Sequence, residues 1–158
     1  MLMKDNIFVT CPRGLETITA GEVAKVLSRE CKTELGGVYV KGGLNDIYLL
    51  NIHLRTAMHV LQELLVFKAD TTEKIYKKIY NYKWSNLIPQ DKTFVIRTKL
   101  NSKNFKNSNF LTLRIKDAIA DRILKDRFKR PYISKENPDF TIVAFVKDDL
   151  VKIYLDSS

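Results

Sequence analysis

Positively charged side chains gather in about one quarter of this 158-residue chain, between Lys92 and Arg130. This stretch contains twelve Lys and Arg residues against three Asp residues, an excess of nine, which equals the formal net charge of the whole chain, +9. The rest of the chain is therefore electrically balanced. Fixed cations concentrated in this way are typical of a surface that binds the phosphates of a polyanion, and RNA is the polyanion we favour. A solvated basic surface without a ligand is the alternative interpretation.

The positions of these cations predict which of them face outward. In the alternating segment 93–100, Phe94 and Ile96 share one face of a predicted strand, and Arg97 and Lys99 share the other. The next nine residues are turn formers around an exposed Phe105, and Phe105 or Tyr132 could stack on an unpaired base. The candidate RNA-binding residues are Arg97, Lys99, Lys103, Phe105, Lys106, Arg127, Lys129 and Arg130.

A helix over about 109–129 must position the two ends of this stretch. Asn107 or Ser108 is the predicted N-terminal cap, which leaves free backbone amides at the positive end of the helix dipole. On the outer face the charges alternate, and Asp121 and Lys125 form a favourable i,i+4 pair, so the middle of the helix is a solvated face. The expected apolar arc consists of Leu111, Leu113, Ile115, Ile119, Ala120, Ile123, Leu124 and Phe128.

The residues that could support catalysis or bind a metal are few. His53, His59, Cys11 and Cys31 have spacings that match no zinc motif, so buried cysteines and structural histidines are expected. The sequence 137–140, Asn-Pro-Asp-Phe, differs from the Asn-Pro-Pro-Phe loop of some methyltransferases at its third position, and we interpret it as a turn. We therefore predict no catalytic residue and no metal ligand in this chain.

Composition places the chain among globular proteins. Its hydrophobic fraction of 45% suffices for a packed core, and no stretch approaches the roughly 20 apolar residues of a membrane span. The N-terminus lacks the apolar core of a signal peptide, and two cysteines do not form a disulfide framework. These features predict a cytoplasmic protein with reduced thiols and no membrane partner.

The first half of the chain reads as the order β-α-β-β-α-β, which is the order of a ferredoxin-like unit. The predicted elements are a strand at 6–10, a helix at 15–29, strands at 38–40 and 46–51, a helix from Leu54 to Leu61 and a strand at 62–69. Surface charge is balanced in this half and basic after it, which places a domain boundary near 68–70. The fold class is thus α+β, with domains at 1–68 and 69–158 that we expect to pack together.

The second half alternates between helical and extended patterns. Acids and Thr71 mark a helix start before Ile75 and Ile79, and Tyr76 and Tyr80 at that spacing favour core positions over a base-stacking platform. The remaining predicted elements are a short helix at 84–88, the strand at 93–100, the helix at 109–129, and two strands at 140–146 and 150–155 joined by a tight turn.

These segments together resemble a known family. FVTCPRGLETITAGEV (8–23) and GGVYVKGGLNDIYLLNIHLRTAMHVL (36–61) resemble the amino-terminal region of bacterial RNA methyltransferases that carry a THUMP domain, especially the large-subunit (23S) ribosomal RNA guanine-N2 methyltransferases. The second half is similar to the THUMP domain itself, in 67–84, 94–123, 130–146 and 151–158. Arg13 and Arg55 lie in the resembling motifs, where they either bind RNA or pair with Glu16 or another acid.

The resemblance implies a ferredoxin-like domain packed on a THUMP domain, which together position structured RNA, with ribosomal RNA favoured over transfer RNA. It also implies a Rossmann-like domain that binds S-adenosylmethionine and follows an exit resembling Leu155 to Ser158. No Gly-rich loop that could hold that cofactor follows a strand in this chain, so we expect no cofactor here and a catalytic domain outside this chain.

Three alternatives remain open at this stage. The chain could be a standalone THUMP protein that binds RNA or assists transfer RNA modification. Its basic surface could instead bind an acidic protein. It could also be a small complete enzyme, which S-adenosylmethionine binding would reveal.

Overall fold

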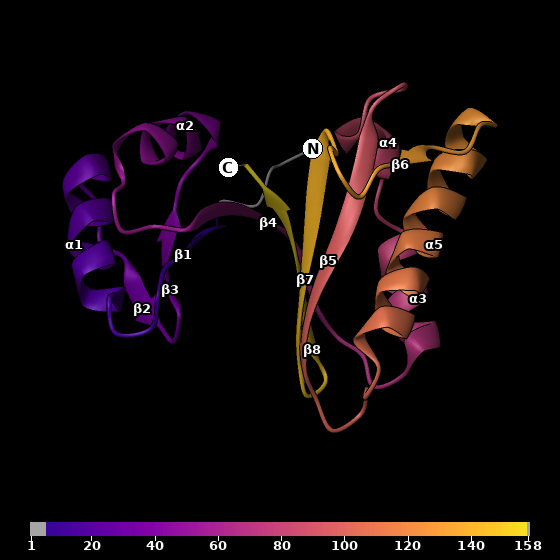
Figure 1. Ribbon diagram of the computed structural model, residues 1–158, viewed down its shortest axis with the longest axis horizontal. Coiled ribbons are helices and arrows are strands. Elements are labelled where there is room, and N and C mark those ends of the chain that lie inside the picture. The colour runs from indigo at the N-terminus through magenta and orange to yellow at the C-terminus, as the bar shows by residue number, and fades with distance from the viewer. Residues whose placement is uncertain (1–5, 158) are drawn as a thin grey trace. The chain divides into compact units, whose positions relative to one another are not determined.

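The computed structural model of the chain describes residues 6–157 and divides into two compact units (Figure 1). The first unit runs to Leu64 and includes the chain from Tyr154 onward, and the second runs from Leu65 to Ile153. Two strands, β4 (His59–Lys68) and β8 (Leu150–Asp156), pass from one unit into the other.

The first unit is an antiparallel sheet with two helices. Its strand order is β2-β3-β1-β4, and β1 pairs antiparallel with both β3 and β4. The helices pack on one face of the sheet, where Val23 of α1 and Ile47 of α2 meet Ile7 and Val9 of β1 in a buried cluster. The elements are β1 (Asn6–Thr10), α1 (Glu16–Leu27), β2 (Lys32–Glu34), β3 (Gly37–Lys41), α2 (Leu44–His53) and the first part of β4.

The predicted order β-α-β-β-α-β is confirmed, but several of its elements lie on other residues. The predicted strand at 46–51 is wrong, since these residues belong to helix α2. Asp46 explains the difference: its carboxylate accepts a hydrogen bond from the Gly43 amide at 2.9 Å and starts the helix. The predicted helix from Leu54 is also wrong, because a loop leads there into β4, which contains Leu61.

The short strand β2 (Lys32–Glu34) was not predicted. All three of its side chains are exposed, so the strand has no apolar alternation to reveal it. Its pairing with β3, in which Lys32 lies opposite Tyr39, defines it instead.

The second unit places helices on one face of a mixed sheet. Its strand order is β8-β7-β5-β6, and β5 runs parallel to both β7 and β6. Helices α3 and α5 lie on the same side of β5, β7 and β8 (Figure 1). The elements are the second part of β4, α3 (Thr72–Tyr80), α4 (Trp84–Leu87), β5 (Thr93–Asn101), α5 (Ser108–Arg127), β6 (Tyr132–Ile133), β7 (Phe140–Lys147) and the first part of β8.

The predicted helix starts of this unit are confirmed by their caps. The Thr71 hydroxyl accepts from the Lys74 amide, and the Asn107 side chain accepts from the Phe110 amide at 3.1 Å. Trp84 is fully buried, and its indole donates to the Ile79 carbonyl at 2.7 Å, which makes it a core residue of this unit. The two-residue strand β6 was not predicted, because two exposed residues carry no periodic pattern.

A polar cluster in the first unit ties helix α1 to the loop before β4. The Glu22 carboxylate accepts from the Thr56 hydroxyl at 2.7 Å and from the backbone amides of Arg55 and Thr56. Burial opposes the charge on Glu22, but the hydrogen bonds from Thr56 prevail and lower the pKa of the carboxyl. Thr19, which is fully buried, shares the Thr56 hydroxyl at 2.7 Å. Arg55 therefore meets an acid through its backbone amide.

We expect Thr56→Val to lower the free energy of unfolding by about 1–3 kcal/mol, because Thr19 and Glu22 both lose a hydrogen-bond partner. Urea unfolding followed by circular dichroism measures this change. Thr33→Val, on the exposed strand β2, is the matched control and should change stability by less than about 0.5 kcal/mol. Equal midpoints for Thr56→Val and the unsubstituted chain would contradict the role of this cluster.

Helix α3 is tied to α5 by a tyrosine–carboxylate bond. The Tyr76 hydroxyl donates to Asp121 at 2.5 Å, which raises the pKa of Tyr76 to about 12. A tyrosine whose pKa is higher in the folded state than in the unfolded state stabilises the fold at pH values below the unfolded pKa, about 10. This stabilisation is lost as the pH rises through 12.

Tyr76→Phe should therefore lower the free energy of unfolding by about 1 kcal/mol at neutral pH, and the difference should shrink as the pH rises from about 10 toward 12. Denaturant unfolding of both proteins across this pH range provides the test. Tyr48→Phe serves as the control, because Tyr48 is 67% exposed. A stability difference that does not depend on pH would be inconsistent with the hydrogen bond.

Candidate nucleic-acid interface

Strand β5 presents two cations on the face turned away from α5. The Thr112 hydroxyl on α5 donates to Thr98 at 2.7 Å, so the even-numbered positions of β5 point toward the helix. Arg97 and Lys99 occupy the opposite face and are exposed, as predicted. Val95 shares that face but is buried.

The neighbouring strand β7 adds an aromatic ring to this face. Lys99 is in register with Phe145, and the Lys99 ammonium lies 6.0 Å from the centre of the Phe145 ring. The sequence interpretation did not include Phe145. The alternation of β7 could have indicated it, because positions in parallel register point to the same side of a sheet.

The loop between β5 and α5 contradicts one predicted site residue. Phe105 is only 7% exposed, so the expectation that it is available to stack on a base is wrong. Phe105 is the single apolar residue between β5 and α5, and burying its ring removes apolar surface from water. Lys103 and Lys106 on either side of it are exposed, and the Ser102 hydroxyl anchors the loop to the Asp148 carbonyl at 2.6 Å.

Arg127 has a structural partner that the sequence did not indicate. Its guanidinium donates to the carbonyls of Ser85 and Ile88, the latter at 2.5 Å, at the end of the short helix α4. Carbonyls at the end of a helix have no helical amide from which to accept a hydrogen bond, so Arg127 caps this end of α4. Arg127 was predicted to bind RNA, but its guanidinium is engaged by these two carbonyls.

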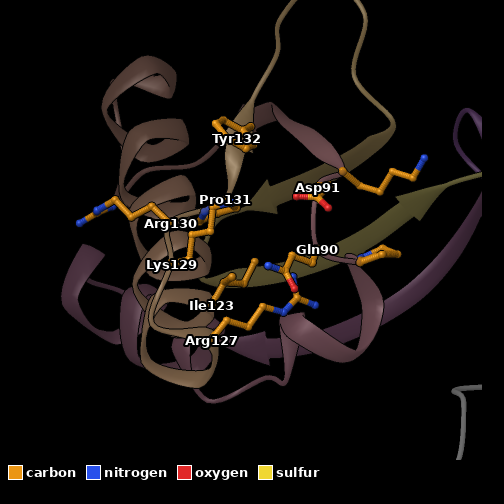
Figure 2. A pocket seen from close by; sticks show the side chains of 10 residues that line it. Gln90, Asp91, Ile123, Arg127, Lys129, Arg130, Pro131 and Tyr132 are labelled. Carbon is orange, nitrogen blue, oxygen red and sulfur yellow. The ribbon is translucent and has the colours of Figure 1, made fainter.

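The other two cations after α5 are differently placed. Lys129 is exposed, with its ammonium 5.6 Å from the centre of the Tyr132 ring. Arg130 is exposed too, and one of its nitrogens lies 3.3 Å from the Asp121 carboxylate. Figure 2 shows the Arg130 side chain extending away from Gln90 and Asp91.

A small open pocket lies beside these residues in the second unit (Figure 2). The Arg127 side chain points toward Gln90, and Tyr132 stands at the opposite side of the pocket. The lining holds four cations and one carboxylate, that of Asp91, so its charge suits an anion. The lining residues are Pro89, Gln90, Asp91, Lys92, Ile123, Arg127, Lys129, Arg130, Pro131 and Tyr132.

Charges along the middle of α5 are engaged by local contacts, as expected, but with other partners than predicted. Asp121 accepts from Tyr76 and Arg130, and the Lys125 ammonium lies 5.7 Å from the centre of the Tyr80 ring. The predicted pair of Asp121 with Lys125 is therefore wrong, and Arg122 with Asp126 at 3.0 Å is the i,i+4 pair instead.

The apolar arc of α5 was predicted correctly in its middle and wrongly at two positions. Ile115, Ile119 and Ile123 are buried, whereas Leu113 is 54% and Phe128 is 91% exposed. The helix ends at Arg127, and Phe128 turns into the left-handed region with φ 59°. A residue there no longer follows the helical periodicity from which its burial was predicted.

Residues 6–157 contain no cluster of three or more His, Cys, Asp or Glu side chains that could bind a metal ion. His59 lies 2.9 Å from Asp156. Cys11 is buried as expected, whereas Cys31 is only half-buried. The Asp139 carboxylate accepts from the amide and hydroxyl of Thr93, and these bonds lower its pKa and fix the turn before β7. In this described part of the chain, no helix has the length and apolarity to span a bilayer.

Comparison with known domains agrees with the two-part fold. Residues 69–156 match the THUMP domain, and residues 6–61 match the RlmL ferredoxin-like domain. The fold predicted for both halves is thereby confirmed.

Solved structures with the same fold extend well beyond the length of this chain. A Listeria monocytogenes protein described as a predicted N6-adenine-specific DNA methylase is 25% identical, with a TM-score of 0.83 over 97% of this chain and 40% of its own. SMU.472, assigned as a methyltransferase and complexed with SAH, is 24% identical, with a TM-score of 0.84 over 99% of this chain and 42% of its own.

A 4-thiouridine synthetase in complex with RNA and bound ATP shares the fold at 16% identity, with a TM-score of 0.64 over 98% of this chain and 41% of its own. The chain thus spans about two fifths of each of these three proteins.

Proposed function

Because this chain belongs to the THUMP domain family, we propose that it is the RNA-binding region of an RNA-modifying enzyme that uses S-adenosylmethionine to methylate its substrate. The observation that carries the proposal is the match of residues 69–156 to the THUMP domain in the part of the chain that holds its excess positive charge. A cationic surface on a domain of this family is suited to phosphate contacts.

Two surfaces of the second unit supply the proposed contacts. Arg97 and Lys99 lie on one face of β5, with Lys103 and Lys106 in the loop that follows. Lys129 and Arg130 follow α5, beside the pocket. Backbone phosphates bind these cations, which position the RNA, and base selection belongs mainly to a catalytic domain.

The finer parts of the proposal come from the family resemblance. The methylated group is the N2 amine of a guanine, and the RNA is ribosomal. The domains are residues 1–68 and 69–158, the catalytic domain is joined to them in the whole protein, and the location is cytoplasmic. The Listeria relative is described as acting on adenine in DNA, whereas the THUMP match favours RNA as the substrate here.

Within residues 6–157, the connection that most resembles a cofactor-binding loop has a structural role instead. The Gly42–Gly43 connection between β3 and α2 is the place where a glycine-rich loop would enter a helix. A side chain at Gly42 would come within 2.7 Å of the Asp46 carboxylate, which itself caps α2. The glycine therefore makes room for Asp46. We assign the cofactor to the catalytic domain of the proposed whole protein.

A second candidate is a THUMP protein that serves transfer RNA modification. The structural similarity to a 4-thiouridine synthetase bound to RNA favours it, and it uses the same two surfaces. Comparing the affinity of the chain for ribosomal RNA fragments and for transfer RNA distinguishes the two candidates.

We expect the double substitution Arg97→Ala and Lys99→Ala to weaken RNA binding about tenfold at low salt without changing the melting temperature, because both side chains are exposed. Six phosphate contacts to single-stranded RNA give a slope of about −4 in a plot of log affinity against log salt. The slope of the variant should be shallower by about 1.4, since two contacts are lost.

The control removes the same number of charges from the first unit, through Lys32→Ala and Lys41→Ala, both exposed. Fluorescence anisotropy with a labelled RNA at several salt concentrations measures all three proteins. A salt-independent affinity, or equal affinity for an acidic protein, would refute RNA binding as the function.

Titration of the chain with S-adenosylmethionine in a calorimeter should give no binding heat, because the proposal assigns the cofactor to a separate catalytic domain. Micromolar binding would instead support a small complete enzyme. Melting temperatures measured with and without the cofactor provide an independent readout.

A further inference from the structure

Phe128 is a large aromatic residue placed almost entirely in solvent. It follows the last residue of α5, and its side chain is 91% exposed. Burying such a ring would stabilise the fold by about 1.5–3 kcal/mol, and the exposed Phe128 ring does not contribute this stabilisation. Packing therefore gives no reason for a phenylalanine at this position.

The backbone at Phe128 gives no reason for it either. Its φ of 59° and ψ of 23° lie in the left-handed region, which glycine or asparagine usually occupies at the end of a helix. The Phe128 amide donates to the Leu124 carbonyl at 2.8 Å, a bond that any residue other than proline could make. An exposed phenylalanine in a strained conformation indicates a role outside the fold.

The neighbours of Phe128 indicate what kind of ligand it would contact. Lys129 and Arg130 follow directly and are exposed, and Tyr132 is 56% exposed. The pocket beside them has Lys92 in its lining, and its single carboxylate is that of Asp91. An aromatic residue thus stands at each end of a five-residue segment that holds two adjacent cations.

We propose that Phe128 stacks on an unpaired base of the bound RNA, while Lys129 and Lys92 bind the adjoining phosphates and Tyr132 offers a second stacking surface. A nucleotide combines an apolar π-face with an anionic backbone, which is the complement of this segment. A protein partner that covered Phe128 would also have to pair the surrounding cations with acids. This inference rests on the proposed RNA-binding function and assigns to it a site for single-stranded nucleotides.

The test compares two RNA hairpins, one with a blunt end and one with a four-nucleotide single-stranded 3′ tail that contains 2-aminopurine. Phe128→Gly should bind the tailed hairpin about tenfold more weakly than the unsubstituted chain and the blunt hairpin equally well. The quenching of 2-aminopurine fluorescence on binding should also disappear. Because glycine suits the left-handed backbone, the melting temperature should stay the same or rise by about 2–4 °C.

Two further variants separate stacking from other causes. Phe128→Leu keeps a large apolar side chain without a ring and should lose affinity as Phe128→Gly does. Phe110→Ala is the control, since Phe110 is 52% exposed in the first turn of the same helix. It should bind both hairpins as the unsubstituted chain does.

The outcomes distinguish this inference from the proposed function. If the unsubstituted chain binds both hairpins and Phe128→Gly does so equally well, stacking by Phe128 is wrong and RNA binding stands. Full affinity of Phe128→Leu, or an equal loss for blunt and tailed hairpins, also overturns the inference. If the unsubstituted chain binds neither hairpin, the proposed function itself fails.

Discussion

The packing of α5 against the sheet of the second unit is the constraint on which its surface depends. Ile115, Ile119 and Ile123 of the helix are buried, as are Phe94 and Ile96 of β5. Charged side chains are excluded from this interface by the cost of desolvating them. The basic residues of this stretch must therefore lie on the other face of β5, in the adjoining loops or on the outer side of the helix. The need to keep the interface between α5 and the sheet apolar thus determines where the basic side chains can lie.

On the outer side of α5, several of the charged side chains are paired with one another. Asp117 and Asp126 pair with Lys116 and Arg122 of the same helix, so the middle of the helix keeps little net charge. Tyrosine rings of α3 lie under two other cations, Arg114 and Lys125. The excess remains on β5 and in the segments at either end of α5. A long polyanion that contacts both would be held at two separated places, which fixes its direction better than one continuous patch.

The sequence predicted those features that a local pattern determines. The strand Asn6–Thr10 and the caps Thr71 and Asn107 followed from apolar runs and residue type. Helix α2 was missed because Asp46 starts it through one side-chain bond. Phe105 was predicted to be exposed and is buried, and Phe128 was predicted to be buried and is exposed. An apolar residue in a loop or beyond a helix end belongs to no periodic pattern that would predict its burial. The partners of Arg127 lie 39 and 42 residues away in the sequence, which no local pattern records.

The parallel pairing of β5 with β7 has a consequence for the order in which the second unit folds. Phe94 lies opposite Phe140, so this pairing closes a long loop that contains all of α5. The strands β7 and β8 are joined by a two-residue turn and can pair early. A long loop closes late, because the conformational entropy of the loop is lost before the contacts between its ends can stabilise the pairing. Arg97 and Lys99 thus come to lie beside Val143 and Phe145 of β7 only when the unit is nearly complete. An incompletely folded chain would carry the same charges without their arrangement, and would bind RNA without orientation.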